Sequence, residues 1–155
     1  MAGPSCAPKS HLSKVLKWQA TTSDPETGRI LLKFKRTDSD DEVLVADATT
    51  WQETGRVAVK GQPVFVMARP DGRQIWVNFA FPDYSHVQVI DTLEQKVVQT
   101  LSPGKAVLHM EFTPRGESVW ISSRDDHRVS VIDTQTFATQ ATMAVDSPSG
   151  IFFTS

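Results

Sequence analysis

The sequence predicts an all-β fold assembled from repeated four-stranded units, and three observations support this. Arg-Pro-Asp-Gly-Arg-Gln-Ile-Trp-Val at 69–77 recurs 44 residues later as Thr-Pro-Arg-Gly-Glu-Ser-Val-Trp-Ile at 113–121. Val-Gln-Val-Ile-Asp-Thr at 87–92 recurs 42 residues later as Val-Ser-Val-Ile-Asp-Thr at 129–134. Nine prolines and eight glycines are spread along the chain and indicate many short strands joined by turns. A period in the low forties with four short strands per unit is typical of a β-propeller blade.

Each of the two complete repeats divides into four strands. Proline and glycine between the first and second strands supply turn chemistry, because proline sets its own φ and glycine accepts a left-handed conformation. Asp91-Thr92 and Asp133-Thr134 end the third strands, where carboxylate and hydroxyl can bond to turn amides. We therefore expect strands at about 64–69, 74–79, 86–90 and 96–101, and again at 106–112, 118–123, 128–132 and 138–144.

The apolar residues of these strands predict how the units pack. Val87 and Val89 alternate with polar or less buried positions, which is the pattern of a half-buried strand. Trp76 and Trp120 occupy the same place in their units, and we expect both to pack between neighbouring blades. No segment has the periodicity of an amphipathic helix.

The chain divides into an N-terminal segment and a series of blades. Residues 1–40 match the repeat poorly and stay unassigned except for a strand near 30–34. Blades follow over 41–155, at about 43–61, 62–104 and 105–147, and 148–155 resembles the start of another. Propellers close with about four to eight blades, so about three to three and a half blades predict part of a larger propeller. The alternative is an arc that assembles with copies of itself.

Composition excludes several functional classes. Eighteen acidic and sixteen basic residues give a net charge of -2, which lacks the basic footprint of a nucleic-acid-binding protein. No apolar run approaches the roughly 20 residues of a membrane span. The first residues contain no apolar stretch, so no secretory signal peptide is visible in this chain. The single cysteine, Cys6, excludes an internal disulfide and a thiolate-rich metal site.

His109 is the main candidate functional residue. The repeat aligns it with Phe65 and Thr154 on the first strand of each unit, and in propellers this inner strand lines the central channel. A channel-facing imidazole can ligate a metal or haem iron, or donate a proton near neutral pH. A histidine whose ring is bonded to neighbouring backbone is the alternative. Simple alternation along the strand would put Val107 on the same face as His109, and Leu108 on the opposite face.

Two loops supply further candidates. Arg124, within 122–127, can hold a carboxylate through a bidentate pair, although an ion pair with an aspartate of its own loop is the alternative. The inserted loop 79–86 offers Tyr84 and His86 beside phenylalanines, which would stack on a flat ligand or cap the end of a blade.

Four blocks of sequence carry a family resemblance. They are Gly-Gln-Pro-Val-Phe at 61–65, Met-Ala-Arg-Pro-Asp-Gly at 67–72, Gly-Lys-Ala-Val-Leu-His-Met-Glu-Phe-Thr-Pro-Arg-Gly at 104–116, and Ser-Pro-Ser-Gly-Ile-Phe-Phe at 147–153. With them the chain resembles, over about 43–155, the cytochrome d1 propeller family. That family includes the d1 domain of dissimilatory nitrite reductase and its relatives in haem d1 biosynthesis, which the chain resembles more. The resemblance implies an eight-bladed propeller.

The resemblance also implies a function and a site. It implies binding of a d1-type haem or its tetrapyrrole precursor, in the periplasm, during haem d1 biosynthesis for nitrite reduction. His109 would be the axial iron ligand or a proton donor. Arg69 and Arg124 would bind the carboxylate side chains of the macrocycle, and Tyr84 and His86 would be further ligand contacts.

The resemblance leaves the type of activity open. An oxidoreductase-type step on the precursor and simple carriage of the ligand both fit, and partners would be other haem d1 maturation proteins or nitrite reductase. A fragment of the d1 domain of respiratory nitrite reductase and a cofactor-free interaction scaffold are the alternatives. The chain has no Cys-x-x-Cys-His site for c-type haem, so a complete nitrite reductase is not expected here.

Overall fold

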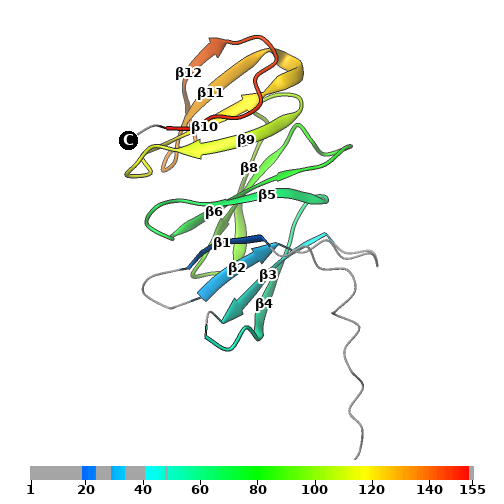
Figure 1. Cartoon of the computed structure of the whole chain (residues 1–155), viewed down its shortest axis with the longest axis vertical. Coiled ribbons are helices and arrows are strands. Elements are labelled where there is room, and N and C mark those ends of the chain that lie inside the picture. Colours follow the sequence, from blue (N-terminus) through cyan, green and yellow to red (C-terminus); the bar gives the residue numbers. More distant parts are fainter. Residues whose placement is uncertain (1–18, 24–28, 34–40, 48, 154–155) are drawn as a thin grey trace, which may run out of the picture.

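The computed structural model describes residues 19–23, 29–33, 41–47 and 49–153. These residues form three four-stranded antiparallel sheets, stacked one after another in chain order (Figure 1). In each sheet every strand pairs with the next strand in sequence. The first strands of the three sheets lie side by side, and so do the last strands of the first two sheets. This is the arrangement of consecutive propeller blades, with the first strand of each blade on the inner edge.

The strand bounds are as follows. The first sheet contains β1 (Gln19–Ser23), β2 (Arg29–Lys33), β3 (Glu42–Asp47) and β4 (Glu53–Ala58). The second contains β5 (Pro63–Ala68), β6 (Gln74–Phe79), β7 (Val87–Asp91) and β8 (Lys96–Leu101). The third contains β9 (Val107–Phe112), β10 (Ser118–Ser123), β11 (Arg128–Asp133) and β12 (Thr139–Ala144), with a single 3₁₀ turn, η2 (Arg124–Asp126), between β10 and β11.

The second and third sheets agree with the repeat analysis. All eight strands begin and end within one residue of the predicted positions. The first sheet starts earlier than the repeats indicate, because β1 and β2 precede residue 43 and pair with β3 and β4. The strand expected near 30–34 is β2. None of the helices in the described residues is both long and apolar enough to cross a membrane.

The middle strands are buried on both faces, so the expectation of half-buried strands was wrong. Side chains of β6 alternate between two cores: Ile75 and Val77 pack towards the first sheet, whereas Trp76 packs towards the third. Val89 and Ile90 of β7 divide in the same way. The second sheet lies between the first and third sheets, so both faces of β6 and β7 pack against apolar cores.

A bulge recurs near the start of each inner strand. The register between neighbouring strands skips one residue at Thr21, at Val64 and at Leu108. The bulge reverses the alternation expected for β9: Val107 joins the buried core, whereas Leu108 is turned outward with 37% of its surface exposed. Simple alternation failed here because a bulge inserts one unpaired residue.

Buried polar side chains in the second strand of the blade satisfy these bulges. Asn78 is fully buried; its Oδ1 accepts a hydrogen bond from the Phe65 N–H at 2.7 Å, and its Nδ2 donates to the Val107 carbonyl at 2.6 Å. Ser122, 44 residues later, accepts from the His109 N–H at 3.0 Å and donates to the Ser149 carbonyl at 2.8 Å. In both repeats one polar side chain therefore joins a bulge to the next inner segment.

The turns between the third and fourth strands of the second and third sheets begin with an aspartate and a threonine. Oδ1 of Asp91 accepts from the N–H groups of residues 93 and 94, and Oδ1 of Asp133 accepts from those of residues 135 and 136. The carboxylates bond to turn amides as predicted. The threonine hydroxyls instead donate to carbonyls of the neighbouring turn, Thr92 to Gly72 and Thr134 to Gly116.

These bonds predict a pH dependence of stability. The N–H groups of Thr136 and Gln135 lower the pKa of Asp133 below its usual value. Because this pKa is lower in the folded protein than in the unfolded chain, the ionised carboxylate contributes stability that is lost as the pH falls through the folded-state pKa. We expect the free energy of unfolding to fall between about pH 5 and pH 2, and to fall less steeply in Asp133→Asn. Urea unfolding across this range measures both slopes; identical slopes would contradict the assignment.

Candidate functional site

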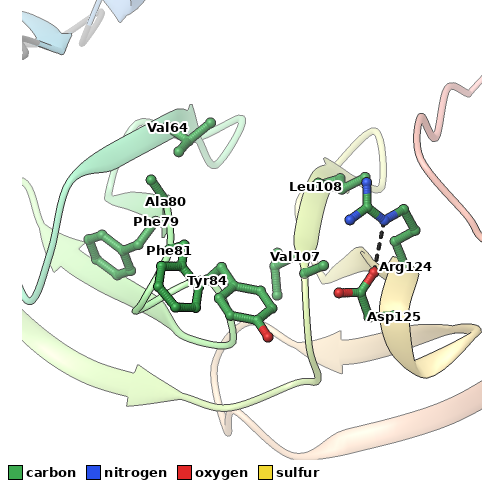
Figure 2. A pocket seen from close by; sticks show the side chains of 10 residues that line it. Val64, Phe79, Ala80, Phe81, Tyr84, Val107, Leu108, Arg124 and Asp125 are labelled. Carbon is green, nitrogen blue, oxygen red and sulfur yellow. Dashed lines mark hydrogen bonds and ion pairs between the residues drawn. The ribbon is translucent and has the colours of Figure 1, made fainter.

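A pocket of about 390 Å³ opens between the second and third sheets, at the edge where β5 and β9 begin. Figure 2 shows the loop after β6 on one side of the pocket and η2 on the other. Val64 and Leu108, the bulge residues whose side chains the structure describes, both line the pocket. The bulges therefore turn two aliphatic side chains out of the strands and into the pocket. Its other lining residues include Phe81, Tyr84, Arg124 and Asp125.

The inserted loop contributes an aromatic wall. Phe81 and Tyr84 stack with ring centroids 5.6 Å apart and an interplanar angle of 29°. Phe81 is 81% exposed, which is unusual for so large an apolar side chain. The Tyr84 carbonyl accepts a hydrogen bond from the Val107 N–H at 2.9 Å, so the loop is anchored to β9. The aromatic wall is thus held in place and open to a ligand.

Arg124 provides the positive charge of the pocket. Its backbone N–H donates to the Ala106 carbonyl at 3.0 Å, which fixes η2 against the start of β9. Its Nε donates to the Asp125 carboxylate at 2.9 Å, the ion pair that the sequence left open as an alternative. In the described part of the chain this is the one ion pair of Arg124, and half of the side chain is exposed. Its two terminal nitrogens can therefore still bind a carboxylate.

His109 lies on β9 next to Leu108, in a row of rings along the inner strands. Its ring is 5.3 Å from that of Phe65 on one side and 5.2 Å from that of Phe152 on the other, between centroids. Its Nδ1 accepts a hydrogen bond from the Ile151 N–H at 3.3 Å. The aligned residue Thr154 lies outside the described residues.

Neither of the other two candidates is among the residues that line the pocket. Arg69 follows the end of β5, at the edge opposite the pocket, where its Nε donates to Asp71 at 2.8 Å and its terminal nitrogen bonds the second carboxylate oxygen. This bond raises the pKa of Arg69 and lowers that of Asp71. His86 lies within the inserted loop, where its Nδ1 is 3.4 Å from the Ser85 hydroxyl and from the Asp83 carbonyl. The structure brings Tyr84 and Arg124 together in the pocket lining, which also includes Leu108, the neighbour of His109, and does not include Arg69.

Sequence reasoning missed the residues that shape the site. Val64 and Leu108 look like ordinary core positions, because a bulge leaves no clear mark in a six-residue apolar pattern. The polar pair Asn78 and Ser122 did carry a signal, since both interrupt apolar strands at the same place in the repeat. No group of three or more histidine, cysteine or acidic side chains suited to a metal ion occurs among the residues the structure describes.

Comparisons with known proteins agree on one family. The family model described as Cytochrome D1 heme domain matches residues 19–155. Protein NirF of Stutzerimonas stutzeri is 54% identical over 113 residues, and Protein NirF of Pseudomonas aeruginosa is 54% identical over 112 residues. These matches cover 73% and 72% of the chain but 29% of each relative, so the chain spans less than a third of their length.

Two solved structures share the fold. Dihydro-heme d1 dehydrogenase NirN in complex with DHE has a TM-score of 0.68 and 21% identity, over 79% of this chain and 26% of that one. Kuenenia stuttgartiensis hydrazine synthase has a TM-score of 0.69 and 21% identity, over 92% of this chain and 41% of that one. At this level of identity they establish the fold alone.

Proposed function

The chain belongs to the Cytochrome D1 heme domain family, and from that membership we propose that it binds haem d1 or a tetrapyrrole precursor during haem d1 biosynthesis. The observation that supports the proposal is the packing of His109 with two phenylalanine rings on β9, whose preceding residues Val107 and Leu108 line a pocket that contains Arg124. The named relatives are Protein NirF, and a protein of the same fold is a dihydro-heme d1 dehydrogenase.

The residues of the site fit a flat, anionic macrocycle. The exposed ring of Phe81, stacked on Tyr84, offers an aromatic face, while Val64 and Leu108 offer aliphatic contact. The free nitrogens of Arg124 suit a propionate or acetate side chain. A pocket of about 390 Å³ would take part of such a ring. A bound tetrapyrrole supplies the conjugated ring and, where it carries iron, the redox chemistry.

We propose the following cellular role for the protein. We place it in the periplasm, with haem d1 maturation proteins or nitrite reductase as partners that deliver or receive the ligand. Both an oxidoreductase-type step on a precursor and carriage of the ligand are consistent with a ring held between His109 and Arg124.

Arg124 provides the test of the pocket. Replacing it with glutamine removes a charge-assisted hydrogen bond to a ligand carboxylate, so we expect the Kd for haem d1 to rise about tenfold, or about 1.4 kcal/mol. The measurement is a titration of haem d1 followed by its visible absorption. Arg115→Gln is the matched control, because Arg115 is an arginine paired with a nearby acid, Glu117, at the opposite edge. Equal Kd values for Arg124→Gln and wild type would contradict the role of Arg124.

A further inference from the structure

The hydrogen bond at His109 determines which ring nitrogen carries the proton. A neutral imidazole has one N–H donor and one nitrogen acceptor, and the nitrogen that accepts a hydrogen bond is the unprotonated one. Nδ1 accepts from the Ile151 N–H at 3.3 Å, so the proton of the neutral ring lies on Nε2. Within residues 41–47 and 49–153, Nε2 has no hydrogen-bond partner of its own. It is therefore free to donate to a ligand.

Ser122 holds both sides of this hydrogen bond in place. On one side it accepts from the backbone N–H of His109 at 3.0 Å. On the other its hydroxyl lies 2.8 Å from the carbonyl oxygen of Ser149, two residues before Ile151. The same hydroxyl is 3.3 Å from the His109 carbonyl oxygen, but it has one hydrogen, and the shorter contact to Ser149 takes it. Ser122 thus connects the strand that carries the imidazole to the segment that carries its donor.

Two phenylalanine rings restrict the plane of the imidazole. Phe65 and Phe152 contact its two sides at interplanar angles of 56° and 48°. If the ring of His109 turned over, a ring carbon would face the Ile151 N–H and the hydrogen bond would be lost. The neighbouring rings restrict the plane of the imidazole, and the hydrogen bond from Ile151 selects which edge of the ring is turned towards it and hence the tautomer.

We infer that Ser122 is a positioning residue that holds His109 as the Nε2–H tautomer, so that His109 donates a hydrogen bond to the bound ligand instead of coordinating its iron. This rests on the proposed function, since it assumes a tetrapyrrole ligand. Coordination requires a nitrogen lone pair, and here Nε2 carries hydrogen while the lone pair of Nδ1 faces the Ile151 N–H. Of the two roles that the family resemblance allows for His109, the geometry points to the donor.

The tautomer can be measured in the chain without ligand. Long-range ¹H–¹⁵N correlation spectra distinguish protonated from unprotonated imidazole nitrogens, and loss of one set of signals in His109→Gln assigns the residue. At a pH where the ring is neutral we expect Nε2 to be protonated and Nδ1 unprotonated. A wild-type ring protonated on Nδ1 would overturn the inference.

Ser122→Ala then tests the positioning role. We expect this variant to populate both tautomers, because it loses the bonds to His109 and Ser149 together. Ser123→Ala is the matched control: Ser123 is the next residue on β10 and is equally buried, and its hydroxyl has no hydrogen-bond partner in the described structure. Ser122→Thr should keep the wild-type tautomer. Ser122→Cys is the second variant, because a thiol fills the space but is a weak donor and acceptor. A folded Ser122→Ala or Ser122→Cys protein with the wild-type tautomer would overturn the role of Ser122.

Binding of ferric haem d1 separates the inference from the proposed function. Electron paramagnetic resonance of the bound ring reports its axial ligands. We expect the same axial ligation in wild type and in His109→Gln, with weaker binding in the variant. Loss of an axial nitrogen ligand in His109→Gln would overturn the inference while leaving the proposed function intact. Failure of the wild type to bind would instead overturn the proposed function, and the tautomer measurement would be unaffected.

Discussion

Trp76→Ala is expected to lower the free energy of unfolding by about 3–5 kcal/mol, the cost of removing a large aromatic side chain from a packed core. Trp76 is fully buried between the second and third sheets, with its ring 5.9 Å from that of Phe112 at an angle of 88°. Its indole N–H donates to Gln74 at 3.0 Å, and Gln74 donates to the Thr134 carbonyl of the next sheet at 3.0 Å. The substitution therefore opens a cavity and also disturbs a polar link between blades.

Trp120 provides the matched control for Trp76. It occupies the same place in the next repeat, but it is only partly buried, with the ring of Phe153 packed against its edge at 5.8 Å. Urea unfolding of both alanine variants should show the smaller loss for Trp120→Ala. Equal losses would contradict the view that the core between the second and third sheets holds the blades together.

Asn78→Ala is expected to cost about 2–6 kcal/mol, because it removes the side-chain partner of two backbone groups and each such group costs about 1–3 kcal/mol. These groups are the Phe65 N–H at the bulge of β5 and the Val107 carbonyl at the start of β9. The variant should also loosen the pocket, since Val64 and Val107 line it. Urea unfolding measures the stability, and the haem d1 titration measures the pocket.

Asn78→Ser is the informative comparison. Serine occupies the equivalent position as Ser122, where its hydroxyl bonds to one bulge N–H and one carbonyl of the following segment. The serine variant should therefore recover part of the stability that alanine loses. If alanine and serine at position 78 destabilise equally, or if neither destabilises, the polar link is not what satisfies the bulge.

The strands of the second and third sheets could be predicted from the sequence because the same strand pattern occurs in two aligned copies. Two copies of the Pro-x-Gly turn and of Val-x-Val-Ile-Asp-Thr fix the strand positions relative to one another, and turn chemistry fixes the ends. Burial on both faces was missed because valines separated by polar residues fit a half-buried strand equally well, until a neighbouring blade covers the second face. The first sheet began earlier than predicted because β1 and β2 lack the repeat motifs.

The site could be predicted only as a set of residue types. His109 was found because a histidine stands where the preceding repeat has Phe65. Both Arg69 and Arg124 were candidates, and the sequence could not show which of them lines a pocket, because spacing alone does not say which end of a strand the pocket occupies. Arg69 is held by Asp71 at one edge, whereas Arg124 faces the pocket at the other. The tautomer of His109 depends on Ile151, which is 42 residues away and which no local pattern links to it.

The most direct test of the proposed function is a haem d1 titration of the wild type, His109→Ala and His127→Ala, followed in the Soret region. His127 is the matched control. It is an exposed histidine directly after η2, its Nδ1 lies 3.0 Å from the Asp146 carboxylate, and it is not one of the rings around His109. We predict saturable binding with a Soret shift in the wild type, an altered shift and weaker binding in His109→Ala, and wild-type behaviour in His127→Ala. A wild-type spectrum that stays unchanged at micromolar ligand, or a His109→Ala protein that binds like wild type, would contradict a tetrapyrrole site at the inner strands.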